Sequence, residues 1–268
     1  MSDTFFETPS LHHLTRLLTD MESAVIAFSG GVDSTFLLKV ARLSGIRTLA
    51  VTALSPSMPE EEFRDAREIA GMIGIPHLII ETAEIESPDF ARNPVDRCFY
   101  CKDELFWKLK EIGLSEHYRF VLDGSNLDDM DDWRPGRRAA LKHGVRSPLI
   151  EAGFRKGDIR RFSRALGLPT WDKAASPCLS SRFPYGEPIT LDGLKQVGEA
   201  ERFLKSLGFG ELRVRHHRET ARIELKEDEI PQMLKSETRR AVVEKLKSLG
   251  YKFISLDLGG FRSGNLNG

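Results

Sequence analysis

The chain of 268 residues is long enough for one large domain or two modest ones. Its composition, 40% hydrophobic and 29% charged, is that of an ordinary soluble globular protein, and a formal net charge of −1 gives no overall attraction to nucleic acids or membranes. No apolar run reaches membrane-spanning length, and the first residues lack the basic and apolar regions of a secretory signal. We therefore expect a cytoplasmic protein with neither a membrane nor a nucleic acid as its partner.

The first half of the chain alternates between apolar segments and segments with helical periodicity. We expect helices at residues 8–20, 34–43, 59–73, 99–112, 133–142 and 155–166, strands at 24–28, 48–53, 77–80 and 118–122, a loop at 81–94 and an extended piece at 147–151. This alternation predicts an α/β fold with a doubly wound parallel sheet and right-handed crossovers. Ligands of such sheets bind beyond the carboxyl ends of the strands.

The composition changes after residue 173. Residues 174–188 contain three prolines and a glycine without periodicity, and we interpret them as a functional loop and linker. A helix at 191–207, strands at 211–216, 221–225 and 251–257, and helices within 227–248 then predict a small α+β domain with antiparallel character. The expected domains are residues 1–183 and 184–268.

A glycine-rich loop connects the first predicted strand to the helix that follows. Two glycines let the backbone turn sharply and approach a ligand, while hydroxyls and the first N–H groups of the helix can bind phosphate oxygens. The alternative is a helix-capping turn without a ligand. No Gly-Lys-Ser/Thr follows, so this is not a Walker loop. The loop predicts a phosphate site made by Ser29, Gly30, Gly31, Asp33 and Ser34.

An acidic run, residues 123–132, follows the strand predicted at 118–122. Such a run is either a solvated loop or part of a metal–nucleotide site. Because it ends a strand of the same sheet as the phosphate loop, we favour a site that includes Asp123, Gly124 and Ser125.

The chain has three cysteines, an odd number that in a reducing compartment favours metal binding or catalysis over structural disulfides. Cys98 and Cys101 form a Cys-x-x-Cys pair, and Cys178 lies far away in the sequence. Three unrelated thiols, a redox pair whose thiol pKa values Arg97 and Lys102 lower, and a three-thiolate site are all compatible with this pattern. Zinc would need a fourth ligand, whereas an iron–sulfur cluster on three thiolates leaves one iron open for chemistry.

Together these motifs resemble the LarE family of ATP-dependent sulfur transferases, which has the PP-loop (adenine nucleotide alpha hydrolase-like) fold. The resemblance covers essentially the whole chain, and its most specific parts are the Pro-Cys-Leu-Ser-Ser-Arg motif and the C-terminal tail. It rests on Ser-Gly-Gly-Val-Asp-Ser (29–34), Arg-Cys-Phe-Tyr-Cys-Lys (97–102), Asp-Gly-Ser-Asn (123–126), Pro-Cys-Leu-Ser-Ser-Arg (177–182), Leu-Arg-Val-Arg (212–215) and Leu-Asp-Leu-Gly-Gly-Phe-Arg-Ser-Gly-Asn (256–265).

The resemblance implies an enzyme that uses ATP and Mg²⁺ to adenylate a carboxylate of pyridinium-3,5-biscarboxylic acid mononucleotide, releases pyrophosphate and replaces oxygen with sulfur. In members with a single cysteine at the position of Cys178, that residue gives up its own sulfur. Because Cys98 and Cys101 are also present, this chain resembles the members in which three cysteines hold a [4Fe-4S] cluster. The resemblance also implies a homo-oligomer, of which a hexamer is one form, and leaves the sulfur donor open.

Residue roles also follow from the resemblance. The loop residues 29–34 are expected to bind the ATP phosphates, and Ala53 is expected near the adenine. Three arginines, whose guanidinium forks match phosphate oxygens, are candidates for the substrate phosphate, the alternative being a solvated basic edge. They are Arg182, Arg213 and Arg215. Glu201 and Glu224 are candidates for a metal or substrate site in the second domain, although surface glutamates are usually solvated.

Three other functions remain open at this point. A tRNA thiolase of the same fold would use a basic face, for which the helix carrying Arg155, Lys156, Arg160, Arg161 and Arg164 is the candidate. An ATP-dependent amidotransferase would not need the three cysteines. A non-catalytic nucleotide sensor would bind ATP without releasing pyrophosphate.

Overall fold

The computed structural model describes residues 8–131 and 134–262. The chain forms two compact units, Met1–Glu84 with Asp96–Ser176 and Ile85–Val95 with Pro177–Gly268. Residues 132–133 of the acidic run and the predicted helix, and residues 263–265 of the tail motif, lie outside the described residues. Within the described ranges, no helix is both long and apolar enough to cross a membrane.

The first unit is built on a four-stranded parallel sheet, which confirms the predicted fold class. The strand order is β3-β2-β1-β4, and all neighbours are parallel. The order reverses at β1, so the loop after β1 lies at the point where doubly wound sheets bind ligands. The strands are β1 (Ser23–Ala27), β2 (Arg47–Leu54), β3 (His77–Glu81) and β4 (Phe120–Leu122).

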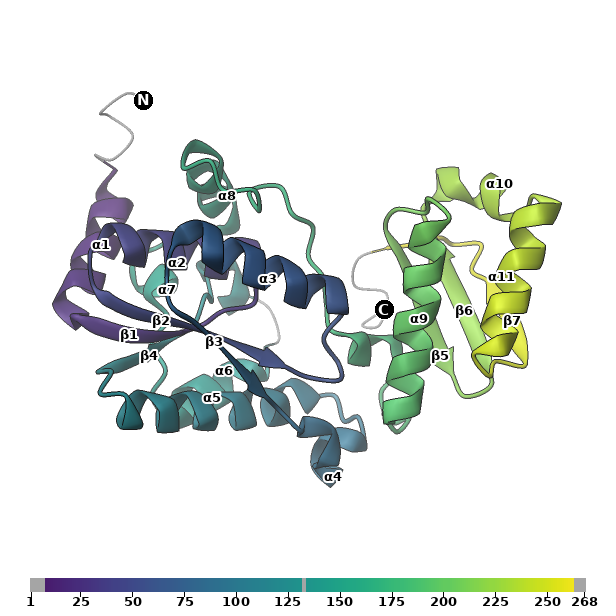
Figure 1. The fold of residues 1–268 in the computed structure, drawn as a ribbon, viewed down its shortest axis with the longest axis horizontal. Helices are drawn as coiled ribbons and strands as arrows, with labels where there is room; N and C mark the ends of the chain where they lie inside the picture. Colours follow the sequence, from purple (N-terminus) through teal and green to yellow (C-terminus); the bar gives the residue numbers. More distant parts are fainter. Residues whose placement is uncertain (1–7, 132–133, 263–268) are drawn as a thin grey trace. The chain divides into compact units, whose positions relative to one another are not determined.

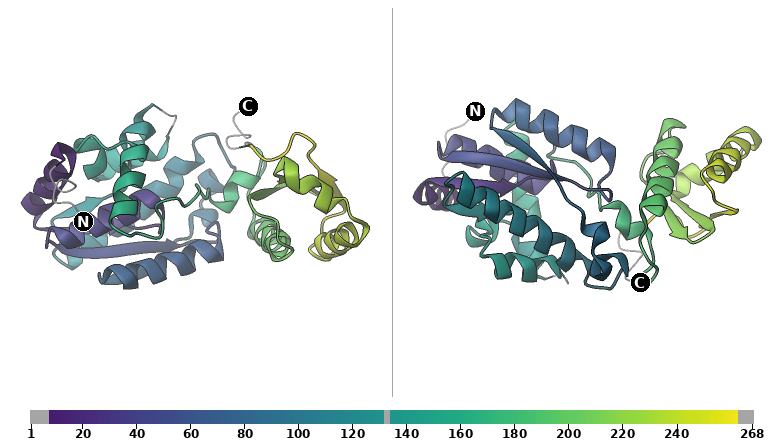
Figure 2. Two further views of the ribbon diagram at one scale, coloured as in Figure 1. Left: turned by 90° about the horizontal axis from the view of Figure 1, so that it is seen from above. Right: turned by 60° about the horizontal axis from the view of Figure 1, so that its bottom comes forward.

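Helices cover both faces of this sheet (Figures 1 and 2). Ala24 and Ile26 of β1 point into a core with the helices of one face, whereas Val25 points into the core with α5 and α6 on the other. This alternation explains why β1 is apolar at successive positions. The first face carries α1 (Pro9–Met21), α2 (Val32–Leu43), α3 (Glu60–Ile73), α7 (Pro148–Glu151) and α8 (Lys156–Ala165); the second carries α5 (Arg97–Ser115) and α6 (Gly136–His143).

Two segments of the first half differ from the sequence prediction. Residues 147–151, expected to be extended, contain α7, because Pro148 occupies its first turn, where a missing N–H costs nothing. The extended part is limited to Arg146, which forms a single parallel bridge with Leu122. The expected loop at 81–94 contains the short helices η2 (Glu84–Glu86) and α4 (Pro88–Ala91).

The second unit is a small α+β domain with a three-stranded sheet of order β5-β6-β7. β5 and β6 are antiparallel, as expected, but β6 and β7 are parallel, because α11 carries the chain back before β7. Leu204 of α9 and Leu246 of α11 pack on the sheet residues Val214 and Ile223. The elements are η4 (Leu179–Arg182), α9 (Leu191–Ser206), β5 (Leu212–His217), β6 (Thr220–Leu225), η5 (Glu227–Glu229), α10 (Ile230–Met233), α11 (Ser236–Ser248) and β7 (Phe253–Leu256).

The segment 85–95 packs within the second unit although it precedes α5. Asn93 is fully buried, and its amide donates to the carbonyl oxygens of Phe183 (3.3 Å) and Pro184 (2.7 Å). The main chain adds a bond from Ile189 N to Ala91 O at 2.8 Å. From the sequence, we expect a domain boundary between residues 183 and 184. In the structure, the two units divide between residues 176 and 177, and the second unit also includes the inserted segment 85–95.

Candidate functional site

The loop between β1 and α2 has a backbone that only glycine allows at Gly30. Its φ is +69°, and a Cβ there would lie 2.9 Å from the Cα of Ala66. The hydroxyls of Ser29 and Ser34 are 3.2 Å apart, and the N–H of Gly31 donates to the Ser29 hydroxyl at 3.3 Å. The loop thus presents hydroxyls and the N-terminus of α2 together, as a phosphate site requires.

The loop after β4 lies directly against this phosphate loop. A Cβ at Gly124 would be 2.9 Å from the backbone nitrogen of Ser34, so no side chain fits between the two loops. Asp123 accepts hydrogen bonds from the N–H of Ser125 (3.1 Å) and from the hydroxyls of Ser125 (2.9 Å) and Ser147 (2.7 Å). The structure therefore brings two of the predicted site motifs together, with Asp123 organising the second loop.

Asp33 of the phosphate loop is paired with a lysine that the sequence analysis assigned only to a possible RNA-binding helix. The ammonium of Lys156 is 2.6 Å from Oδ2 of Asp33, across 123 residues of sequence. Oδ1 of Asp33 is buried and has no hydrogen-bond partner within the described part of the chain. Burial raises the pKa of the Asp33 carboxyl above its ordinary value, although Lys156 acts in the opposite direction.

At the carboxyl end of β2, Ala53 is half-buried and pairs with Ile80 of β3. Just beyond it, the hydroxyls of Ser55 and Ser57 both donate to Oε1 of Glu84, the latter at 2.9 Å. Glu84 is 2% exposed, and its Oε2 has no hydrogen-bond partner among the described residues. Sequence reasoning did not identify this buried carboxylate, because an acidic residue after a strand is usually solvated.

The three cysteines occupy both units. Cys98 and Cys101 lie near the N-terminus of α5 in the first unit, at positions i and i+3, which share one face of the helix. Cys178 precedes η4 in the second unit. Cys98 and Cys178 are exposed, and Cys101 is half-buried. In residues 8–131 and 134–262, no group of three or more His, Cys, Asp or Glu side chains is arranged to hold a metal ion.

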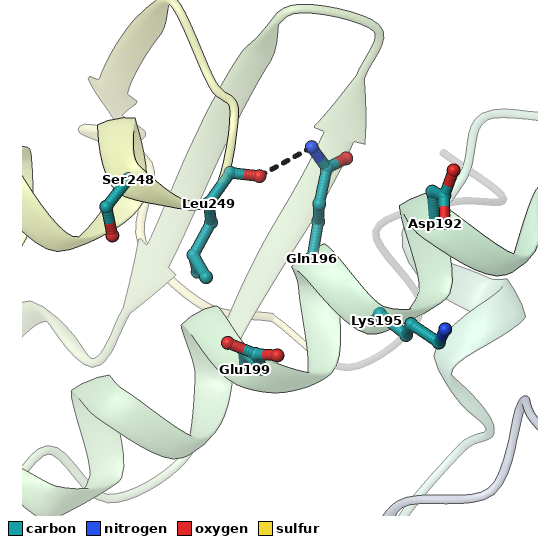
Figure 3. Close-up of a pocket in the computed structure, with 6 residues that line it drawn as sticks. All are labelled: Asp192, Lys195, Gln196, Glu199, Ser248 and Leu249. Carbon is teal, nitrogen blue, oxygen red and sulfur yellow. Dashed lines mark hydrogen bonds between the residues drawn. The ribbon is translucent and has the colours of Figure 1, made fainter.

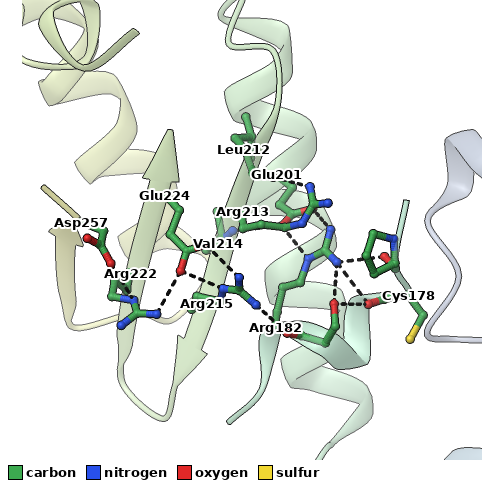
Figure 4. Close-up of polar contacts among 12 residues, drawn as sticks. Cys178, Arg182, Glu201, Leu212, Arg213, Val214, Arg215, Arg222, Glu224 and Asp257 are labelled. Atoms are coloured by element: carbon green, nitrogen blue, oxygen red, sulfur yellow. Dashed lines mark hydrogen bonds and ion pairs between the residues drawn. The ribbon is translucent and has the colours of Figure 1, made fainter. Parts of the chain in front are cut away.

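Two of the predicted phosphate-binding arginines form buried ion pairs with the two predicted glutamates (Figure 4). Arg182, 2% exposed, donates to both carboxylate oxygens of Glu201 at 2.8 and 2.9 Å. Arg215 does the same with Glu224 at 2.9 and 2.8 Å. Arg182 also donates to the carbonyl oxygen of Cys178 at 3.2 Å, so this pair fixes the main chain at the cysteine. The Cys178 sulfur points away from the guanidinium (Figure 4).

Arg213 lies between these two pairs without a carboxylate partner of its own among the bonds that the structure shows. Its guanidinium donates to the carbonyl oxygen of Leu212 at 2.7 Å and stacks 4.9 Å from the ring centre of Phe261. Burial and the neighbouring positive charges of Arg182 and Arg215 lower its pKa. Arg222 donates to Glu224 at 3.0 Å and lies 3.6 Å from Asp257, so that four guanidinium groups face three carboxylates among the residues that the structure describes. The cluster therefore has one surplus positive charge and favours an anion.

Apart from these clusters, a cavity of about 500 Å³ lies between α9 and the end of α11 (Figure 3). The amide of Gln196 crosses it to the carbonyl oxygen of Leu249 at 2.7 Å. It is lined by Asp192, Lys195, Gln196, Glu199, Ser248 and Leu249, none of which is a predicted site residue.

Comparison with known proteins places this chain in a family. No family model matches the chain. It is 45% identical, over 96% of both chains, to an uncharacterised protein of Synechocystis sp.. It is 42% identical, over 95% of this chain and 92% of the relative, to the pyridinium-3,5-bisthiocarboxylic acid mononucleotide synthase of Lactiplantibacillus plantarum. The structure of an NMN synthetase from Francisella tularensis superposes with a TM-score of 0.51 at 19% identity, covering 74% of this chain and 87% of that one, which shows a shared fold.

The match to the synthase extends over both units and therefore covers the phosphate loop and the arginine cluster alike. The parallel sheet, the phosphate loop at its switch point and this extent of identity agree with one another. The chain belongs to the LarE family of ATP-dependent sulfur transferases, within the PP-loop superfamily.

Proposed function

We propose that this protein converts a carboxylate of pyridinium-3,5-biscarboxylic acid mononucleotide into a thiocarboxylate, a step in the synthesis of a nickel-pincer nucleotide. The 42% identity to the synthase of Lactiplantibacillus plantarum, over nearly the whole of both chains, carries this proposal. The organised phosphate loop and the surplus positive charge among the arginines of the second unit support it.

The first step would be adenylation. An oxygen of the substrate carboxylate forms a bond to the α-phosphorus of ATP, while the bond from this phosphorus to the bridging oxygen of the β-phosphate breaks. The electron pair leaves on pyrophosphate. Ser29, Gly31 and Ser34, with the N-terminus of α2, would bind the phosphates and stabilise the charge that develops on the leaving group.

Mg²⁺ would offset part of the phosphate charge in this step. Oδ1 of Asp33 fits such an ion, since it is a buried carboxylate oxygen with no hydrogen-bond partner in the described ranges, and carboxylates together with substrate phosphates are the usual ligands of Mg²⁺.

The second step would be sulfur transfer. A sulfur nucleophile attacks the carbonyl carbon of the acyl adenylate, the carbon–sulfur bond forms, and the bond to the AMP oxygen breaks. The products are the thiocarboxylate and AMP. The phosphate of the substrate mononucleotide would bind at Arg213, with Arg182 and Arg215 positioned by their glutamates to raise the positive potential there.

For the source of sulfur, we propose that Cys98, Cys101 and Cys178 are ligands of a [4Fe-4S] cluster. Cys98 and Cys101 fit this role because they lie one helical turn apart at the N-terminus of α5, where the helix dipole favours thiolates, and Cys178 is exposed. When bound, such a cluster would supply sulfur without consuming the protein. Reduced thiols also fit an enzyme of the cytoplasm, where we expect this protein to act. We further expect the protein to form a homo-oligomer.

The decisive measurement is the content of iron and acid-labile sulfide in protein purified without oxygen. About four of each per chain, lost when any one of the cysteines is replaced, is expected for a cluster on three thiolates. Cys101→Ala should keep pyrophosphate release and stop sulfur transfer, whereas Asp33→Ala should abolish pyrophosphate release. Absence of iron after reconstitution would reject the cluster and leave Cys178 as a sulfur donor that is used once.

A further inference from the structure

Lys156 connects α8 to the phosphate loop of the first unit. Its ammonium lies 2.6 Å from Oδ2 of Asp33, and 38% of its side chain remains exposed. We propose that Lys156 is a phosphate-binding residue of the ATP site, which moves from Asp33 to the β- and γ-phosphates when ATP binds. This inference deepens the proposed function, because it assigns a cation to the leaving pyrophosphate.

The position of Lys156 is fixed by bonds that involve the second loop of the site. Its backbone N–H donates to Oδ2 of Asp128 at 2.8 Å, and the guanidinium of Arg155 donates to Oδ1 of the same residue at 2.6 Å. Asp128 belongs to η3 (Leu127–Met130), which directly follows the loop whose Gly124 touches the backbone of Ser34. The start of α8 is thereby held at the phosphate loop, while the four-carbon stem of the lysine stays free to shift its charge.

The charges of the loop give the reason for the exchange. Residues 29–34 contain one acidic residue and no basic one, so the loop supplies hydroxyls and N–H groups but no cation. A Walker loop carries its own lysine toward the β- and γ-phosphates. Here the corresponding charge would come from α8, and a lysine suits the task because its ammonium is a compact charge on a flexible stem. Once Lys156 leaves, both oxygens of Asp33 are available to Mg²⁺.

The competing explanation is that Lys156 only neutralises Asp33 and stabilises the loop. The two explanations differ in which variants and which ligands are affected. A role limited to holding Asp33 predicts that Lys156→Gln, which keeps a hydrogen-bond donor for Asp33, binds MgATP and pyrophosphate like the parent, and that only Lys156→Met weakens them. A direct role would weaken, in both variants, only ligands that carry β- and γ-phosphates.

The test compares binding of MgATP, magnesium pyrophosphate and AMP to the full chain by calorimetry, without the carboxylate substrate. Lys156→Gln removes the charge and keeps a donor for Asp33, whereas Lys156→Met removes both, so the two variants together separate the explanations. Arg161→Gln is the matched control, because it removes the same charge from an exposed position of α8 that pairs with Asp158.

Loss of one charge-assisted bond predicts ATP and pyrophosphate binding about 10- to 100-fold weaker in the Lys156 variants. AMP binding should stay within about twofold, and the control should match the parent for all three ligands. Equal weakening of all three ligands, or no weakening of ATP in Lys156→Gln, would overturn the proposal. Because no carboxylate substrate is present, this outcome is independent of which carboxylate the enzyme adenylates.

Discussion

Gly124 sets the distance between the two loops of the ATP site, and its replacement by alanine tests that geometry. The added Cβ would lie 2.9 Å from the nitrogen of Ser34, 3.1 Å from its Cα and 3.3 Å from the carbonyl carbon of Asp33. All three atoms belong to the backbone, so no side-chain rotation relieves the contact. The first of these contacts must open from 2.9 Å to at least 3.4 Å, the beginning of ordinary van der Waals contact, which displaces one loop from the other.

Overpacking of this kind costs about 1–3 kcal/mol. If the displaced loop has to return for ATP to bind, the same free energy appears as an affinity loss of about 5- to 150-fold, since about 1.4 kcal/mol corresponds to a factor of ten. If the loop instead stays displaced, the free energy of this overpacking appears as a lower stability of the protein toward urea. Gly124→Ala should therefore weaken ATP binding, lower the unfolding free energy, or both.

The matched control is Gly71→Ala in α3, where a Cβ would have no atom within 4 Å. Alanine at this helix position should stabilise the protein by about 0.4–1 kcal/mol and leave ATP binding unchanged. Calorimetric ATP titration and urea unfolding of both variants give the comparison. A Gly124→Ala protein that equals the parent in both measurements would refute the close packing of the two loops.

Two further predictions concern stability. Arg182→Ala should cost about 3–5 kcal/mol in urea unfolding because it leaves Glu201 buried and without its bidentate partner, whereas loss of an exposed ion pair such as that of Arg161 should cost less than about 1 kcal/mol; similar values for both would contradict the burial of the first pair. Burial lowers the pKa of His77 and His216 in the folded protein below 6.5, the ordinary value that applies to the unfolded chain. The free energy of unfolding is therefore not reduced by these histidines above pH 6.5, and it decreases as the pH falls from 6.5 through their folded-state pKa values. Urea unfolding above and below pH 6.5 should show this loss of stability, and replacing both histidines with glutamine should reduce it. An unchanged pH dependence of stability in the double variant would contradict the prediction.

The parts of the site that follow a single strand could be predicted from the sequence. The loop 29–34 and the loop at Asp123 each come directly after an apolar strand, and the sheet rule places such loops at one edge. The sequence does not show that the two loops touch through Gly124, because this requires the strand order in which β4 neighbours β1.

Side-chain partners far apart in the sequence could not be predicted. Lys156 meets Asp33 across 123 residues, and its surroundings in a basic helix suggested RNA instead. Arg215 and Glu224 pair because β5 and β6 are antiparallel neighbours, a register that depends on the folded hairpin. Periodicity also failed for residues 147–151, where only four residues form α7, too few for a helical pattern to be visible.

The inserted segment 85–95 has a consequence for the order in which the chain can fold during synthesis. Segment 85–95 is synthesised about ninety residues before Phe183 and Pro184, whose carbonyl oxygens accept the hydrogen bonds of the Asn93 amide. The amide of Asn93 can form these hydrogen bonds only after Phe183 and Pro184 have been synthesised. By then every residue of the first unit, which ends at Ser176, has already been made. For the same reason, no single cut divides the polypeptide into its two units, and a fragment that begins at residue 177 would lack the buried amide of Asn93 that binds its Phe183 and Pro184 carbonyl oxygens.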